Sequence, residues 1–559
     1  MVLIGLRITG GLNLEATELQ APLIAHGCWF DEPISVSGTT ASELRLTACR
    51  IPGLAGDQLH TRGDLDLSAS EVGVVSLQRA HIGGSVLLIG TELARGTVPI
   101  ALGDGTLRPR EAATATREGI SLMAEGIHIE GDLLCEQGFR AGGEVHLSRA
   151  RVAGMVGSSH ALFDGDLIAE GLQVEGALAF RDGFVAKGVV ALPGARVSRD
   201  ISMIGAKLQA LSADSCRVDG GLFLREGFRC EEKVRLIGGT VAGQISFSGS
   251  RLVDGLHADR LSAGAGMYFR SNFHSSGEVR LCGAEVGGQL SLTGATLTSS
   301  TGLALDLEGA RIDQDLMLRF AEPPAGGVDL TDTRAGRIAD SEATWPSLLR
   351  LESCEYGAVY ATEDWESRPP PHGRWQRLWM GVKRLRPSTS EEVKRRLRWL
   401  SLAEQERYSP RPYTQLVETY RRQGRDADAR RVAYERELRR ASGLRPAGRA
   451  WNAFLRWTVG YGYKPLRAVA LLIALVVVGG LVFASFHAQS DLVASRPTHP
   501  QFVASIYALD RLVPVISFGL RDAYVPHGAA QWWAFAYTLI GWALTVAVIA
   551  GLNAAVRRE

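Results

Sequence analysis

Residues 131–147 read GDLLCEQGFRAGGEVHL, and the same pattern returns three more times along the chain. The four copies begin at Gly131, Gly176, Gly220 and Ala265, with offsets of 45, 44 and 45 residues. Each copy carries one phenylalanine at the same place and a valine six residues later. A fixed period in this range is typical of a solenoid or an array, because each unit needs its neighbours to bury its apolar face. The recurring aromatic residues, which we expect to form a structural ladder, are Phe139, Phe184, Phe228 and Phe273.

A finer spacing identifies the kind of solenoid. Between residues 63 and 93 the apolar side chains recur in steps of 5, 5, 5, 6 and 5 residues, which fits neither a helix nor one long strand. Such steps suit a chain that turns a corner every few residues, and four of them make a coil of about 22 residues. Equivalent side chains then stack roughly 4.8 Å apart. We therefore predict a mainly β fold, a long right-handed β-solenoid over residues 1–365, interrupted by an excursion loop at 94–118.

The near-zero net charge of +1 conceals a strong asymmetry along the chain. Residues 1–370 hold 32 Lys and Arg against 47 Asp and Glu, whereas residues 371–467 hold 24 against 9. The chain is thus an acidic body followed by a basic collar. An acidic solenoid surface favours basic protein partners or self-association, and we expect no nucleic acid as a partner.

Residues 373–465 form the basic collar and read as a helical linker. Within it, two amphipathic stretches meet at Gly424 and resemble a single tetratricopeptide-like helical hairpin. One such hairpin is too small to form a repeat domain, so we expect a spacer or docking element.

Residues 466–559 are expected to form a membrane domain. Two apolar stretches, 468–486 and 531–553, are each long enough to cross the hydrocarbon core of a bilayer. Lysine and arginine flank both stretches, which predicts a two-pass protein of the inner or plasma membrane with both termini and the solenoid on the cytoplasmic side.

Between the two stretches, residues 502–520 are apolar but too short and interrupted to span. They either lie on the outer surface or re-enter the membrane, as in a simple cation pore formed by a homo-oligomer. In the pore alternative Asp510 and Asp522 would attract cations, and Ser517 to Gly519 would line the wet cavity.

The sequence shows no known catalytic, nucleotide-binding or metal-binding motif. No glycine-rich nucleotide-binding loop opens a βαβ unit, and no nucleophile elbow occurs. The twelve histidines are dispersed without metal-ligand spacing, and the seven cysteines contain no CxxC pair. The sequence therefore predicts no catalytic residue, no cofactor and no metal site, and its cysteines read as small buried side chains of a reducing compartment.

Several longer stretches carry a family resemblance. They are YTQLVETYRRQGRDADARRV (413–432), WTVGYGYKP (457–465), IYALDRLVPVISFGLRDAYVP (506–526) and WWAFAYTLIGWALTVAVIAGL (532–552). Together with the repeats they resemble a group of actinobacterial membrane-anchored proteins, often labelled "oxidoreductase" or "membrane-associated oxidoreductase", whose solenoid is similar to pentapeptide-repeat and bactofilin-like β-helices. The resemblance implies a solenoid on a membrane anchor and supplies no catalytic residues.

We expect a membrane-anchored cytoplasmic scaffold or protein-interaction module, with the lipid bilayer and other proteins as its partners. Two alternatives stay open: an oligomeric ion-channel-like protein gated by the solenoid, and an oxidoreductase, as the family label suggests.

Overall fold

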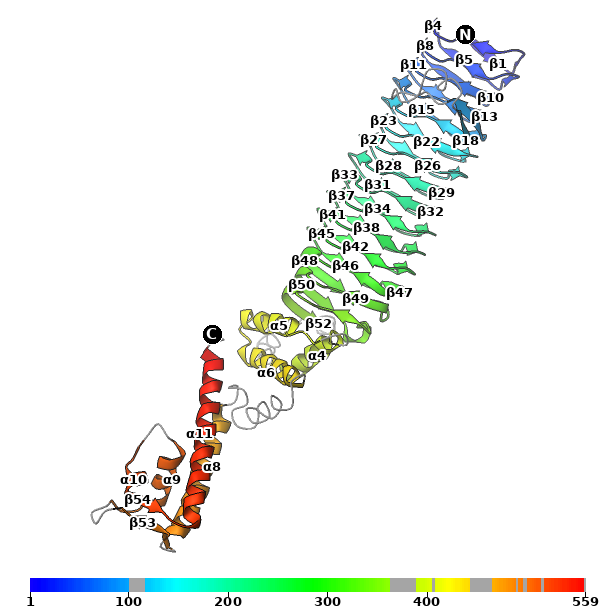
Figure 1. Ribbon diagram of the computed structural model, residues 1–559. Coiled ribbons are helices and arrows are strands. Elements are labelled where there is room, and N and C mark those ends of the chain that lie inside the picture. The colour runs from blue at the N-terminus through cyan, green and yellow to red at the C-terminus, as the bar shows by residue number, and fades with distance from the viewer. Residues whose placement is uncertain are drawn as a thin grey trace, which may run out of the picture. The chain divides into compact units, whose positions relative to one another are not determined.

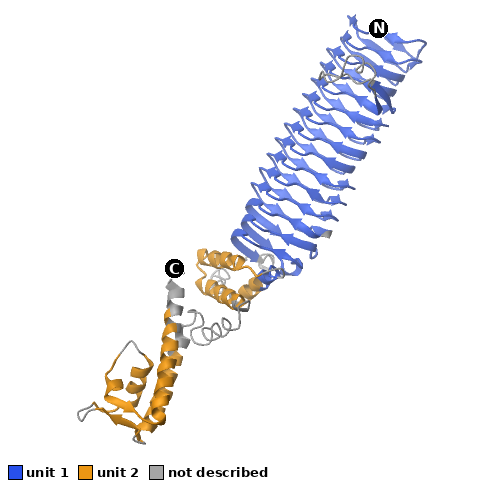
Figure 2. Cartoon of the chain, viewed as in Figure 1, with its two compact units in different colours: residues 1–387, 398–407 blue, residues 388–397, 408–559 orange. Residues whose placement is uncertain are grey.

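The structure is a computed structural model of the whole chain that describes residues 1–99, 116–361, 389–404, 408–442, 465–488, 491–495, 500–513 and 517–556. Parts of the predicted segments fall outside these residues: 362–365 of the solenoid, 100–115 of the excursion loop, and 373–388, 405–407 and 443–464 of the linker. The same holds for 489–490, 496–499, 514–516 and 557–559 of the membrane domain, of which 514–516 belong to the segment 502–520. The chain divides into two compact units (Figures 1 and 2). The first unit comprises residues 1–387 and 398–407, and the second comprises residues 388–397 and 408–559.

The first unit is a parallel β-solenoid of about 15 turns with about 22 residues in each turn, as the repeats predict (Figure 1). A typical coil has four short strands, because the apolar steps of five or six residues leave room for only a few extended residues between corners. Strands of successive coils pair in parallel and build two long sheets. Two successive coils consist of β19 (His128–Ile129), β20 (Leu133–Leu134), β21 (Arg140–Ala141) and β22 (Glu144–His146), then β23 (Arg151–Val152), β24 (Val156–Gly157), β25 (Leu162–Phe163) and β26 (Leu167–Ile168).

The interior of the solenoid alternates large and small side chains from coil to coil. The strand registers place the ladder phenylalanines at one position, with a small residue at that position in every intervening coil. That column runs Phe139, Ala161, Phe184, Ala206, Phe228, Ser250, Phe273 and Ala295.

A second column compensates for the first. It runs Val145, Leu167, Val190, Leu211, Val234, Leu256, Val279 and Leu305, so valine accompanies each phenylalanine and leucine accompanies each small residue. Leucine is one methylene larger than valine, so this column makes up part of the volume that each small residue leaves in a close-packed interior. This alternation explains why the sequence repeats every two coils.

The corners between strands use residues that tolerate tight backbone geometry. In one column of corners, Arg149 and the glycines that follow it at 171 and 194 all have positive φ, near +60°. This region favours glycine, because a side chain there crowds its own backbone. A positive φ is thus a requirement of this corner, and glycine meets it without strain, although Arg149 adopts it as well.

The predicted excursion at 94–118 is an insertion within one coil of the solenoid. β17 (Gly96–Pro99) pairs antiparallel with the start of β18 (Thr116–Met123), and the other end of β18 rejoins the parallel sheet beside β22. His81 in β14 (His81–Ile82) then pairs directly with His128 in β19, so the coils on either side remain in contact.

The last coils have longer strands. These are β47 (Thr296–Asp306), β48 (Arg311–Leu318), β49 (Ala325–Asp329), β50 (Arg334–Asp340) and β52 (Glu355–Ala361). Within the same unit, Trp399 packs edge-on against Tyr356, with ring centroids 6.4 Å apart, and Arg398 forms a 2.7 Å ion pair with Glu342. These contacts cover part of the final coil.

The second unit begins with helices. α5 (Arg411–Arg422) and α6 (Asp426–Ser442) form an antiparallel pair joined at Gly424, which has φ of +71°. Their contacting faces bury Leu416, Tyr420 and Val432. α4 (Thr389–Leu402) precedes them, and Glu392 on this helix forms a 2.9 Å ion pair with Arg425.

The rest of the second unit contains α8 (Pro465–Ala488), β53 (Leu492–Ala494), α9 (Ala504–Leu512), α10 (Leu520–Ala523), β54 (Tyr524–Pro526) and α11 (Ala529–Val556). Tyr537 of α11 donates a hydrogen bond to the backbone carbonyl of Leu475 in α8, at 2.9 Å. α9 approaches both long helices at glycines: a Cβ at Gly480 would lie 3.5 Å from Ser505, and one at Gly541 would lie 2.0 Å from the carbonyl oxygen of Leu512.

Among the described residues, one helical stretch, Ala470–Ala488, is long and apolar enough to cross a membrane. It overlaps the first predicted span, 468–486. The second predicted span, 531–553, lies within helix α11 but does not reach the same measure over its described residues. The expectation of two spans is therefore supported for the first span alone, in part because some of the apolar C-terminal end of α11 is outside the described side chains.

Candidate functional site

One face of the solenoid carries a row of outward-pointing side chains, one from each coil. The register aligns Thr40, His60, His81, His128 and Arg151 in successive coils. The residue after each of these points inward, so Ile82 and Ile129 are fully buried beneath the histidines. The alternation of a short strand thus fixes three imidazoles in line on the outer surface.

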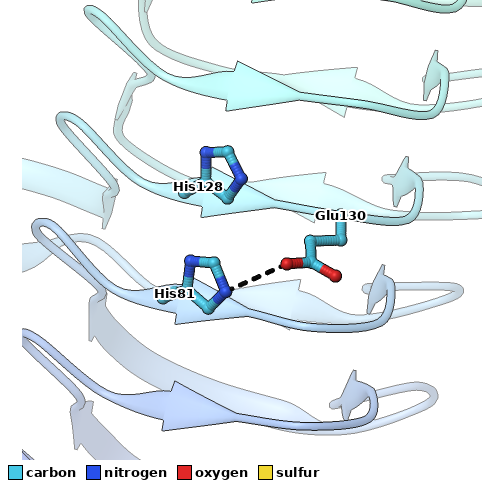
Figure 3. A group of neighbouring side chains, drawn as sticks. All are labelled: His81, His128 and Glu130. Carbon is cyan, nitrogen blue, oxygen red and sulfur yellow. Dashed lines mark ion pairs between the residues drawn. The ribbon is translucent and has the colours of Figure 1, made fainter.

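The imidazoles of His81 and His128 stack face to face (Figure 3). Their ring centroids are 4.9 Å apart and their planes differ by 4°. Glu130 lies two residues beyond His128 and turns its carboxylate toward His81, with 3.2 Å between His81 Nε2 and Glu130 Oε1. One ligand atom from each residue lies within 4.8 Å of the other two. Two histidines and one carboxylate are a ligand set that divalent transition metals use.

His60 extends the stack by one coil but does not join this group. Its ring centroid lies 5.7 Å from that of His81, and the planes differ by 27°. Its Nδ1 lies 3.0 Å from the carbonyl oxygen of Gln58, which orients the ring toward its own corner.

A second group with metal-binding residue types is formed by Cys282, Asp306 and Glu308. Here Arg280 donates from Nε to Cys282 Sγ at 3.4 Å and lies 4.0 Å from Asp306. Burial and the neighbouring Asp306 raise the pKa of the Cys282 thiol to about 12. Because a metal ligand must be the thiolate, and a guanidinium occupies the space beside it, this group is the weaker metal site.

An open pocket of about 380 Å³ lies beside β18, the strand that returns to the solenoid. Its lining includes Arg117, Glu125, His146 and Arg149. Both ring nitrogens of the buried His146 are engaged: Nε2 lies 2.9 Å from Glu144, and Nδ1 lies 3.3 Å from Arg117. With neither nitrogen free, His146 holds the pocket wall together and offers no metal-binding lone pair.

The cysteines match their expected role as buried side chains. All seven are free, and all but the half-buried Cys282 are buried. Burial raises the pKa of Cys135, Cys230 and Cys354 to about 12, which disfavours the reactive thiolate.

The four residues assigned to a pore alternative do not share one environment. Asp510 is buried and accepts two backbone hydrogen bonds of 2.8 Å, from Phe518 N–H at Oδ1 and from Arg521 N–H at Oδ2. Ser517, Gly519 and Asp522 are exposed. Asp510 therefore holds the turn that leads into α10, and a pore role for the four residues stays a prediction.

The cluster of His81, His128 and Glu130 was not predicted from the sequence. The excursion separates the two histidines along the chain, so no short metal-binding spacing is visible. The signal that could reveal it is the coil register: once the excursion is removed, His60, His81 and His128 occupy one column. The four ladder phenylalanines lie in the core and take no part in this surface.

Comparison with protein-family models, with curated proteins and with solved structures gives no match for this chain. The resemblance to membrane-anchored solenoid proteins therefore stays an expectation.

Proposed function

We propose that this chain is a membrane-anchored scaffold, in which the solenoid presents binding surfaces and the long C-terminal helices hold it to a lipid bilayer. The observation that carries the proposal is the exposed apolar surface of α8 and α11. Large apolar side chains on both helices are half to three-quarters exposed, among them Leu481 at 70%, Leu539 at 69% and Trp532 at 77%. Large apolar side chains exposed along two helices mark a contact with lipid or with another protein.

The dimensions and composition of the helices favour lipid. α8 has 24 residues and α11 has 28, so they measure about 36 and 42 Å, against a hydrocarbon core of about 30 Å. Trp532 and Trp533 lie near the start of α11, where tryptophan suits the boundary between lipid and water. In this proposal α11 is the second span.

The charges beside the helices support one orientation. Lys464 and Arg467 stand at the start of α8, and Arg557 and Arg558 follow α11. Because lysine and arginine flank spans on the cytoplasmic side, both ends of the anchor and the solenoid are assigned to the cytoplasm.

A scaffold role fits the surface of the solenoid. Its columns repeat one side chain per coil, at the roughly 4.8 Å spacing of paired strands. Such regular outer faces suit extended protein partners or a second copy of the chain, and the acidic balance of residues 1–370 favours basic partners.

The anchor is tested by fractionation of cells that express the full chain. The wild type is expected in the membrane fraction and to resist extraction by alkaline carbonate. Leu481→Arg with Leu539→Arg places two charges on the lipid-facing surface and is expected to shift the protein toward the soluble or aggregated fraction. Ile4→Arg, at an equally exposed apolar residue of the solenoid, is the matched control and should stay with the membrane. A wild type that washes off the membrane would contradict the anchor.

Protease protection tests the orientation. Protease added to intact cells should leave the solenoid whole and should degrade it after permeabilisation. Cleavage of the solenoid in intact cells would reverse the assignment of sides.

The two alternatives make different predictions. A pore predicts that purified protein in liposomes passes small cations as an oligomer, and that Asp522→Asn changes the flux. An oxidoreductase predicts a bound flavin or nicotinamide, visible as cofactor absorbance or a thermal shift. Tight liposomes and the lack of both cofactor signals leave the scaffold.

A further inference from the structure

We propose that His81, His128 and Glu130 form a binding site for one divalent transition-metal ion of the zinc class, on the outer face of the solenoid. This inference is independent of the scaffold role and of the membrane anchor. It rests on the geometry of three described side chains from two successive coils (Figure 3).

His81 Nε2 and Glu130 Oε1 lie close enough together to bind one metal ion. Two ligand atoms of a tetrahedral zinc ion, each about 2.0 to 2.1 Å from the metal, lie about 3.3 Å from each other. The observed separation is 3.2 Å. Two of the ligands therefore already have the spacing of a metal site.

His128 can reach the same ion by a small movement of its side chain. Its ligand atom lies within 4.8 Å of the other two, so it must move closer by no more than about 1.5 Å to reach tetrahedral spacing. The stacked rings direct their nitrogens side by side, so His128 has to tilt toward the shared point. Both histidines are only half-buried, and a rotation about the Cβ–Cγ bond, whose torsional preferences are broad, is open to them.

Two imidazoles and one carboxylate are ligand types that favour a transition metal. In the metal-free protein His81 Nε2 and Glu130 Oε1 form an ion pair when the imidazole carries a proton on that nitrogen. A metal ion takes the place of that proton, which is released to solvent, and the same two atoms become ligands. Imidazole nitrogen selects zinc, nickel, copper or cobalt over calcium and magnesium, which prefer oxygen ligands alone. A water molecule completes the coordination on the exposed side.

The position gives the site a structural effect. His81 and His128 belong to the coils on either side of the excursion, where the chain departs from its regular pairing. A shared ion would tie these coils together at the point where the excursion interrupts the chain. Because the ion binds the folded arrangement and finds no preformed site in the unfolded chain, binding raises the melting temperature.

The test uses the full chain in detergent, produced without a polyhistidine tag and stripped with a chelator. Titration with zinc chloride by calorimetry should show one saturable site per chain. Cobalt(II) should give visible d–d bands of a tetrahedral site, and zinc should remove them. Zinc should also raise the melting temperature, and magnesium at the same concentration should not.

Variants separate this site from background binding. His81→Ala, His128→Ala and Glu130→Gln should each weaken zinc binding by about 10-fold or more and abolish the thermal shift. His60→Ala, in the neighbouring coil of the same column, and His274→Ala, on the other sheet, should bind as the wild type does. His128→Gln, which keeps a polar side chain, repeats the test if His128→Ala unfolds.

Three results would overturn the site. The first is unsaturable zinc binding that survives in His81→Ala and His128→Ala, which means adventitious ions only. The second is an equal loss on His60→Ala, because that residue lies outside the group. The third is saturable binding without tetrahedral cobalt bands, which places the ion elsewhere.

Discussion

Asp132 accepts a hydrogen bond at Oδ1 from the backbone N–H of Met155 in the next coil, at 2.7 Å. The same contact recurs at other corners, where the backbone N–H groups of Ser85, Val189 and Gly221 donate to Asp64, Asp166 and Asp200, each at 2.7 Å. The carboxylate thus accepts a hydrogen bond from a backbone N–H group that has no partner in the neighbouring strand. A charged acceptor makes this bond stronger than a neutral one.

This contact requires glycine directly above the aspartate. A Cβ added to Gly154 would lie 2.1 Å from Asp132 Oδ1 and 2.6 Å from the backbone oxygen of Gly131. We expect Gly154→Ala to destabilise the solenoid, because rigid backbone must move, and Asp132→Ala to cost roughly 1 to 3 kcal/mol through the lost hydrogen bond. Thermal or urea unfolding measures both. If Gly154→Ala melts with the wild type, close stacking does not control this corner.

Because large and small side chains alternate in the core, neighbouring coils should be destabilised by opposite changes. One coil should lose stability when its large residue is made small, and the next when its small residue is made large. Phe228 is completely buried, and its column neighbours are Ala206 and Ser250. Phe228→Ala should cost about 3 to 5 kcal/mol, because its column neighbours, an alanine and a serine, are too small to fill the space. Ala206→Leu should cost about 1 to 3 kcal/mol by overpacking against Phe184 and Phe228. Denaturant unfolding gives both values, and a neutral Ala206→Leu would contradict the alternation.

Asp164 links three coils and makes stability depend on pH. Its carboxylate lies 2.7 Å from Lys187 Nζ and 2.9 Å from Arg140 Nη2. The Lys187 ammonium first, and then Arg140, lower the pKa of the Asp164 carboxyl. The contribution to stability is complete above the unfolded-state pKa of about 3.9 and is lost as pH falls through the lower folded-state pKa.

Asp164→Asn should therefore lower the melting temperature near neutral pH and narrow its difference from the wild type as the pH falls below about 4. Melting curves across this range measure the effect. A constant difference at every pH would show that the ion pairs do not contribute.

Asp510 and Asp522 separate a structural from a transport role. Asp510→Asn replaces one acceptor oxygen by a donor, so one of the N–H groups of Phe518 and Arg521 loses its partner, at a cost of about 2 kcal/mol. Hydrogen exchange should then speed up at residues 517–523 in the detergent-solubilised chain. Asp522→Asn, at an exposed side chain, is the control and should leave the exchange unchanged. Equal exchange in both variants would contradict the turn-holding role of Asp510.

The repeat at Gly131, Gly176, Gly220 and Ala265 was sufficient to predict a β-solenoid with coils of about 22 residues, because each coil must present apolar side chains at every inward position. The sequence also indicated helices after the solenoid and a first span at 468–486. The second span, 531–553, was also predicted from the sequence and stays a prediction, because α11 does not reach the length and hydropathy of a span over its described residues.

What the sequence determined by itself is therefore periodic or local: the coil length, the apolar columns and the apolar helices, because each depends on residues close together in the chain. Only the tertiary structure brought His81, His128 and Glu130 to one point, since the excursion separates the histidines and only the coil register aligns them. It also assigned Asp510 to backbone donors of a later turn. Contacts of both kinds depend on how distant segments stack, which no short spacing in the sequence records.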